Sequence, residues 1–102
     1  MLIHVMVKRE DGEYVAHALE FDLVSAGDTP EDAIRAIKDS IATYFEACRS
    51  MGLDPRDCGR PAPQEFYDEY KQIFKKPNSV FWIGTLDAED LTNHEREEAA
   101  VG

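Results

Sequence analysis

The stretch that decides the fold is VSAGDTPEDAI, residues 24–34. It begins as an extended run and turns at Gly27, a residue that can adopt backbone angles closed to other residues. Thr29 is a good N-cap residue, and Pro30 follows at the first helical position, where its missing N–H costs nothing. Two acidic residues then fall in the first turn, where the helix dipole favours negative charge. The stretch therefore predicts a strand that stops at Gly27 and a helix that starts at Pro30.

The helix that starts at Pro30 is the clearest element that the sequence predicts. Its apolar residues recur at spacings of three and four, which places them on one face. Gly52 ends the pattern, and Pro55 lies beyond it. One apolar stripe requires one apolar surface to cover it. The stripe consists of Ile34, Ile37, Ile41, either Tyr44 or Phe45, and Cys48.

The residues before this stretch predict a β-hairpin, because Asp11-Gly12 is a strong two-residue loop signal between extended runs at 2–8 and 14–19. In that register Val7 faces Ala16, and all other pairs follow. One face is then purely apolar, and we expect it to receive the helix stripe. This face carries Ile3, Val5, Val7, Ala16 and Ala18. The other face is mixed, and its two histidines suggest partial exposure; it carries His4, Met6, Lys8, Val15, His17 and Leu19.

The rest of the chain predicts two more strands and a second helix. These are a third strand at 23–26, a proline-rich loop at 53–63, helical spacing at 64–74 and a fourth strand at 79–86. The predicted fold class is α+β with the element order β-β-β-α-(α)-β, an antiparallel sheet with the main helix packed on one face. We place the domain at residues 1–86 and an acidic tail at 87–102. Asp87 is a candidate cap for a short helix through Glu98.

Composition points to a soluble protein with an acidic surface. The chain has 102 residues, which suggests one domain. Its 21 acidic residues outnumber 11 basic ones, for a formal charge of −10. Such a chain repels nucleic acid phosphates and attracts basic partners, although simple solvation accounts for the charge equally well.

Cysteine usage and hydropathy favour the cytoplasm. Cys48 and Cys58 are the only cysteines, and they form no CxxC pair. No signal peptide is recognised before Met1, so a disulfide framework is not expected. No apolar run approaches the roughly 20 residues needed to cross a bilayer, so we expect no membrane association.

The segment from Tyr14 to Phe45 resembles the HicB-like antitoxin family. The matching residues are YVA at 14–16, DL at 22–23, VSAGDT at 24–29 and EDA at 31–33, followed by the long helix. The resemblance implies a β-β-β-α-β unit with a partial ribonuclease H-like fold. It also implies a partner, a small basic toxin that cleaves messenger RNA and that the antitoxin blocks. Many members carry a C-terminal DNA-binding segment, but no basic segment follows Leu86, which makes operator binding doubtful.

Three acidic residues near strand ends are the candidate site. Ribonuclease H-type enzymes place several carboxylates around two metal ions. Exposed turn acids, with Asp28 serving the helix start, are the stronger interpretation, so we expect no metal, no cofactor and no catalysis. We instead assign Glu20, Asp22 and Asp28 to a surface that binds a basic protein partner.

For the other residues with reactive side chains, a structural role is favoured over a catalytic or ligand-binding role. His4 and His17 fall diagonally near each other, but a metal or a general base needs a third group, and none is evident. His94 lies in the tail, and Ser25 and Cys58 lack a nucleophile context. Aromatic residues able to stack bases have no basic groove beside them, so core or interface roles are favoured; these are Phe66, Tyr67, Tyr70, Phe74 and Trp82.

Two classes of function therefore lead. The first is an antitoxin-type binding module that sequesters a basic RNA-cleaving protein. The second is a self-associating structural domain that forms a homo-oligomer, including a HicB-like protein with no toxin partner. A metal-dependent nuclease ranks third.

Overall fold

The computed structural model describes residues 1–72, 80–89 and 91. Their elements, in chain order, are β1 (Leu2–Glu10), β2 (Glu13–Ala18), β3 (Leu23–Gly27), α1 (Pro30–Ser50), α2 (Pro55–Cys58), α3 (Gln64–Gln72) and β4 (Val80–Asp87).

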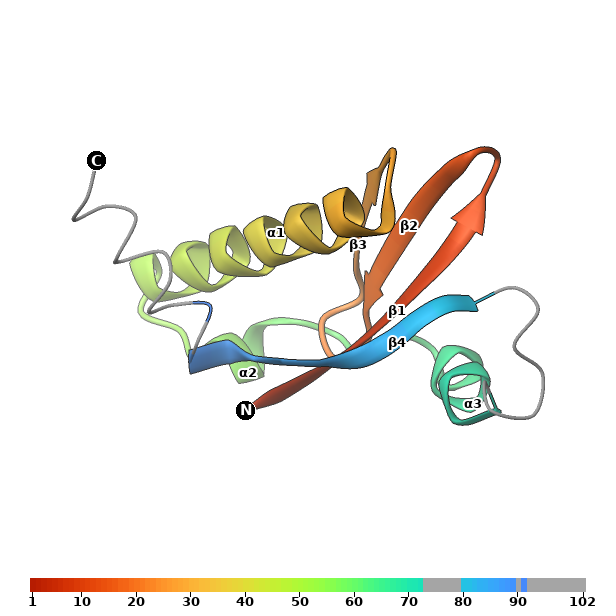
Figure 1. The fold of residues 1–102 in the computed structure, drawn as a ribbon. Coiled ribbons are helices and arrows are strands. Elements are labelled where there is room, and N and C mark those ends of the chain that lie inside the picture. The colour runs from red at the N-terminus through yellow and green to blue at the C-terminus, as the bar shows by residue number, and fades with distance from the viewer. Residues whose placement is uncertain (73–79, 90, 92–102) are drawn as a thin grey trace.

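The four strands form one antiparallel sheet in the order β3-β2-β1-β4 (Figure 1). Val7 lies opposite Ala16 in the β1–β2 hairpin, which is the register that the Asp11-Gly12 loop predicts. β4 pairs with the other side of β1, where Val5 lies opposite Gly84. The predicted α+β class with an antiparallel sheet is therefore confirmed.

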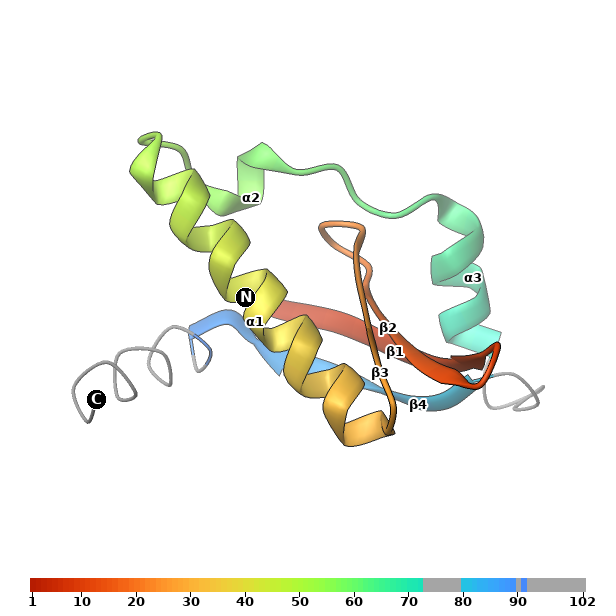
Figure 2. The ribbon, with the colours of Figure 1, turned by 90° about the horizontal axis from the view of Figure 1, so that it is seen from above.

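Helix α1 packs across one face of this sheet (Figures 1 and 2). All five residues of the predicted apolar face are 0% exposed, so the two faces were assigned correctly. The position left open between Tyr44 and Phe45 is resolved, because Phe45 is buried in the core and Tyr44 is partly buried at its edge. The helix buries Ala33, Ile37, Ile41, Phe45 and Cys48.

Helix α3 lies on the opposite side of the sheet from α1 (Figure 1). The ring of Phe66 meets the ring of His17 edge-on at 4.8 Å between centroids, and Tyr70 meets His4 in the same way at 5.3 Å. The Tyr70 hydroxyl also donates a hydrogen bond to the carbonyl of Gly84 in β4, at 3.3 Å. The expectation of partial exposure is therefore wrong for His17, which is only 9% exposed because α3 covers it.

The β3–α1 junction follows the predicted chemistry at Thr29 but not at Gly27. The Thr29 hydroxyl accepts a hydrogen bond from the backbone N–H of Asp32 at 3.1 Å, which confirms the N-cap. Gly27 does not have a positive φ. A Cβ at this position would lie 2.6 Å from the backbone nitrogen of Ala33, so glycine is required by the close approach of the first turn of α1. Gly52, with a φ of 72°, follows the end of α1.

One segment differs from the sequence prediction, and another agrees with it where it is described. The loop predicted at 53–63 contains the single turn α2, which begins where the Asp54 side chain accepts the backbone N–H of Arg56 at 2.9 Å. At the end of β4, the Asp87 side chain accepts the backbone N–H of Glu89 at 2.9 Å, in the manner of the predicted cap. Ala88 and Leu91 are buried in the core. The remainder of the predicted helix through Glu98, and His94, lie outside the described residues.

Candidate functional site

The turn between β2 and β3 places two of the three predicted acids, and each carboxylate meets a different histidine. Glu20 receives the backbone N–H of His4 at 2.6 Å and contacts the His4 Nδ1 at 2.7 Å. Asp22 contacts the Nε2 of His17 at 2.6 Å. The two pairs join both histidines of the mixed face to two of the candidate acids, and they share no residue. The arrangement fixes the turn against the sheet.

Glu20 lies in a more enclosed position than the sequence suggested. Its side chain is 20% exposed, against 47% for Asp22. Burial raises the pKa of Tyr70 and of Tyr67, and the negative charge of Glu20 raises both further, which places this carboxylate beside α3. Of the predicted contact acids, Asp22 and Asp28 are the exposed ones.

Asp22 adopts a left-handed backbone conformation, with a φ of 51°. Aspartate tolerates this region better than most residues because its short side chain can bond locally. The conformation turns the chain into β3 and aims the carboxylate at His17, whose side chain is 11% exposed. Phe66 covers the imidazole on one side, whereas the Asp22 side chain is 47% exposed.

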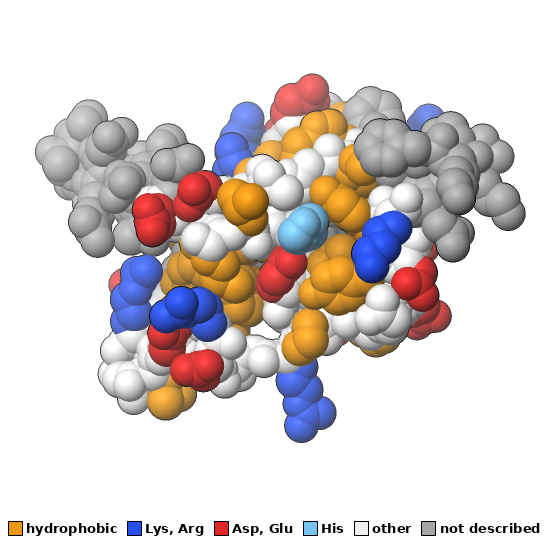
Figure 3. All heavy atoms as spheres, turned by 90° about the horizontal axis from the view of Figure 1, so that it is seen from below, with side chains coloured by type: hydrophobic (Ala, Val, Ile, Leu, Met, Phe, Trp, Pro, Cys, Tyr) orange, Lys and Arg blue, Asp and Glu red, His pale blue; other side chains and the backbone are white. Residues whose placement is uncertain are grey.

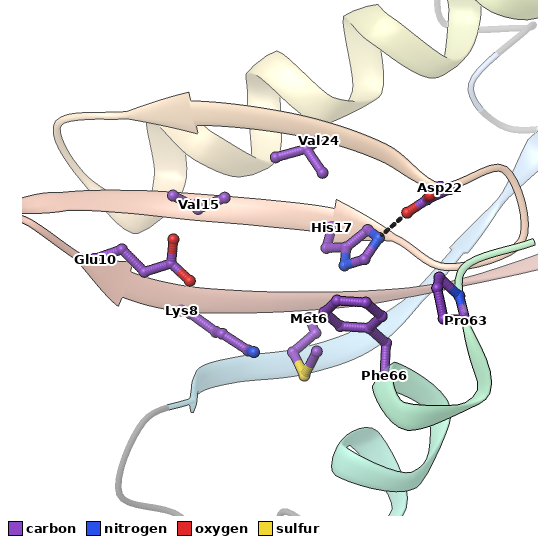
Figure 4. Close-up of a pocket in the computed structure, with 9 residues that line it drawn as sticks. All are labelled: Met6, Lys8, Glu10, Val15, His17, Asp22, Val24, Pro63 and Phe66. Atoms are coloured by element: carbon purple, nitrogen blue, oxygen red, sulfur yellow. Dashed lines mark hydrogen bonds and ion pairs between the residues drawn. The ribbon is translucent and has the colours of Figure 1, made fainter.

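An open groove of about 300 Å³ runs over the same face beside α3. Figure 4 shows Glu10 at one end and Asp22 at the other, with Val15 and Val24 between them. Phe66 and Pro63 form the wall on the side of α3. In Figure 3, which views the molecule from this side, hydrophobic side chains lie among charged ones around a histidine.

The charges around the groove are not balanced. The Lys8 ammonium lies in the lining, but it is paired with Glu69 of α3. Glu10 lies directly opposite Glu13 across the hairpin. Like charges in facing strand positions are mutually repulsive, so a cation near the groove would be attracted to this end as well as to Asp22.

The candidate metal ligands and nucleophiles have the following surroundings in the described structure. Within residues 1–72, 80–89 and 91, no group of three or more His, Cys, Asp or Glu side chains is arranged to hold a metal ion. The Ser25 hydroxyl is hydrogen-bonded to the Ser40 hydroxyl of α1 at 2.7 Å. The nearby Cys48 thiol and burial raise the pKa of the Cys58 thiol to about 11, so little reactive thiolate is present at neutral pH.

No helix among the described residues has the length and apolar character needed to span a bilayer. Comparison with known proteins gave no matching family model, no similar curated protein and no similar solved structure.

Sequence reasoning missed the groove, although two signals were available. The helical pattern at 64–74 had an aromatic stripe with no surface assigned to it. The mixed face carried Met6 and Leu19, both of which are 0% exposed in the structure. Together these signals indicate that the second helix covers part of the mixed face, and the uncovered remainder is the groove.

Proposed function

We propose that this protein is an antitoxin-type binding module of the HicB-like class, which sequesters a small basic RNA-cleaving protein in the cytoplasm. The observation that carries the proposal is the pair of exposed acids, Asp22 and Asp28, which flank β3 within the segment that resembles this family. The partial ribonuclease H-like assignment of the fold belongs to the same proposal. The strand order β3-β2-β1-β4 with α1 on one face is its structural support.

Charge supplies the mechanism of recognition. A formal charge of −10 on 102 residues attracts a basic partner at separations within about a Debye length, beyond which salt screens the attraction. Opposite charges across an interface mainly speed association and exclude wrong partners. Asp22 and Asp28 provide direct contacts, while Glu20 holds the turn that presents Asp22 through its bonds to His4.

The decisive experiment measures inhibition of RNA cleavage. The probe is a small basic protein encoded next to this gene, purified and shown to cleave RNA. Addition of one equivalent of the acidic 102-residue protein to this basic probe is expected to suppress RNA cleavage. Surface plasmon resonance is expected to show that the on-rate of the complex between the two proteins falls as salt rises. The double variant Asp22→Asn with Asp28→Asn should lower the on-rate. Its matched control is Asp39→Asn with Glu46→Gln, two exposed acids on the outer side of α1.

Two results would overturn the proposal. One is cleavage that continues undiminished with an excess of this protein and no detectable complex. The other is metal-dependent RNA cleavage by this protein alone that is lost in Asp22→Asn, which would establish the nuclease instead.

The second candidate function is self-association as a structural domain. It is favoured by β4, which ends the sheet and carries no charged residue between Val80 and Leu86. Terminal strands with uncharged edges pair readily with a second copy. Sedimentation equilibrium over a wide range of protein concentrations tests self-association. A homo-oligomer that binds no basic partner would favour this second function over the antitoxin-type function.

A further inference from the structure

We propose that the outer edge of β3 captures an extended segment of a protein partner that carries a basic residue at each end and apolar residues between them. This inference rests on the proposed function and specifies how the partner is held. The segment adds a fifth strand to the sheet, and its alternate side chains enter the groove over β2 and β3.

β3 is an edge strand of the described sheet. It ends the sheet, and no other described strand pairs with its outer side. Its five residues, Leu23–Gly27, include no charge and no proline, the two features that most often protect an exposed edge. Such an edge offers a row of backbone donors and acceptors to an incoming strand.

The side chains of β3 separate into an inner and an outer set. Ser25 is hydrogen-bonded to Ser40 of α1, so the residues in phase with it face the helix. Val24 and Ala26 lie opposite His17 and Val15 and therefore face the groove. Both are exposed, and Val24 is 58% exposed, an apolar surface that a partner side chain would bury.

Carboxylates bracket this strand. Asp22 and Asp28 adjoin its two ends, and both are exposed. Asp22 lines the groove together with Val24, and Asp28 follows the other end of the strand, so a segment that places apolar residues over the groove places its first and last residues near the two aspartates. Although Asp22 contacts His17, a carboxylate has lone pairs for further donors. Lys8 is not a competing cation because Glu69 is bound to it.

The same geometry disfavours a second copy of this chain as the occupant. If two β3 strands paired antiparallel about Ser25, Asp22 of each copy would face Asp28 of the other. Two pairs of like charges would then stand at the ends of the new interface, where facing like charges are destabilising. A segment with basic ends replaces both repulsions with attractions.

The probe is a synthetic seven-residue peptide, Lys-Thr-Val-Thr-Val-Thr-Lys, titrated into the full chain and followed by NMR. Saturable shifts are expected in Leu23–Gly27. Alternate amides of β3 should exchange more slowly, because only every second residue of an edge strand points its backbone groups outward. A peptide with glutamate in place of both lysines should bind at least tenfold more weakly. A peptide N-methylated on the pairing edge should not bind.

Variants of the protein test the two ends separately. Asp22→Asn keeps a residue that tolerates the positive φ, and Asp28→Asn removes the second charge. Each variant should lower the affinity for the lysine peptide by roughly twofold to fivefold, the range for exposed ion pairs. Val24→Lys, at an exposed position, places a cation between them and should weaken binding further. The control double variant Asp39→Asn with Glu46→Gln on α1 should leave the affinity for the lysine peptide unchanged.

The outcomes separate this inference from the proposed function. Equal binding of the N-methylated peptide, shifts confined to another surface, or no saturable shift at millimolar peptide would overturn the edge-strand mode. If the basic RNA-cleaving protein is still bound and inhibited, only the mode of capture is wrong. If neither peptide nor basic protein binds, the proposed function fails too.

Discussion

The Nε2 of His17 lies 2.6 Å from a carboxylate oxygen of Asp22, and the ring of Phe66 closes over the same imidazole at 4.8 Å between centroids. Through these two contacts, His17 connects the sheet, the β2–β3 turn and α3. His17 thus joins three elements on the mixed face through one polar and one aromatic contact, whereas α1 packs on the other face through an apolar stripe.

Removal of the Phe66 ring tests this connection. Phe66→Ala should lower the free energy of unfolding by about 1–3 kcal/mol, because a half-buried aromatic is lost together with its edge contact to His17. The His17 ring signals in NMR should move at the same time. Glu65→Ala, at an exposed position on the same helix, is the control. Unchanged stability and unchanged His17 signals would mean that α3 does not pack on this face.

The cap of α1 gives the second prediction. Thr29→Ala removes the oxygen that accepts the N–H of Asp32, so it should cost about 1 kcal/mol in denaturant melts. Thr29→Ser retains the acceptor and should lie close to the original protein. If Thr29→Ala also leaves the free energy of unfolding unchanged, another group accepts the N–H of Asp32, and Asp28 is the nearest candidate in sequence.

Gly27 gives the third prediction, because backbone atoms of α1 already occupy the space that a side chain at this position would need. A methyl group there would lie 2.6 Å from the backbone nitrogen of Ala33 and 2.7 Å from the carbonyl carbon of Asp32, and neither atom belongs to a movable side chain. Gly27→Ala should therefore cost roughly 1–3 kcal/mol through a shift of the helix. Gly12→Ala, where no atom lies within 4 Å, is strained only by its φ of 82° and makes a useful contrast. A neutral Gly27→Ala in urea unfolding would show that the junction is looser than described.

Local signals predicted the half of the molecule built around α1. The Asp11-Gly12 loop set the register, the junction at residues 27–32 set the helix start, and the 3.6-residue period set which face of α1 is buried. Each of these depends on neighbours in sequence. The reason for glycine at position 27 was not visible, because it is a contact between β3 and α1 and not a backbone angle.

The other half depends on contacts between residues far apart in sequence. The two histidines of the mixed face suggested partial exposure, which is correct for His4 but wrong for His17. Their partners, Glu20 and Asp22, are brought to them by a turn in which Asp22 has a φ of 51°. No residue pattern encodes that turn as strongly as Asp-Gly encodes the hairpin, so the placement of these acids came only with the structure.

The small residues beneath α1 give the fourth prediction. Ala16 and Ala18 are 0% exposed on the face that α1 covers. Ala16→Leu or Ala18→Leu should overpack this contact and cost roughly 1–3 kcal/mol in thermal or denaturant unfolding. The control is Ala26→Leu, at an exposed position on β3 facing away from α1. Comparable stability for all three variants would contradict the tight approach of helix to sheet.

Tyr44 gives a prediction that depends on pH. Its hydroxyl is buried and has no hydrogen-bond partner among the described residues. Burial, with the Cys48 thiol nearby, raises the pKa of Tyr44 to about 12 from an ordinary value of 10.0. Because the folded protein holds the proton more tightly than the unfolded chain, stability is complete below pH 10 and falls as the pH rises from 10 towards 12. Tyr44→Phe should remove this part of the alkaline loss.

At neutral pH the same substitution should raise the free energy of unfolding by about 1 kcal/mol, since it removes a buried hydroxyl that has lost water and gained no partner. Urea melts at pH 7, 10 and 11 on the original protein, on Tyr44→Phe and on Tyr14→Phe as a control measure both effects. The Cys58 thiol, with a pKa of about 11, also titrates in this range, so the comparison between the two tyrosine variants carries the result. A Tyr44→Phe protein that is less stable at pH 7, with an unchanged alkaline slope, would show that the hydroxyl is hydrogen-bonded after all.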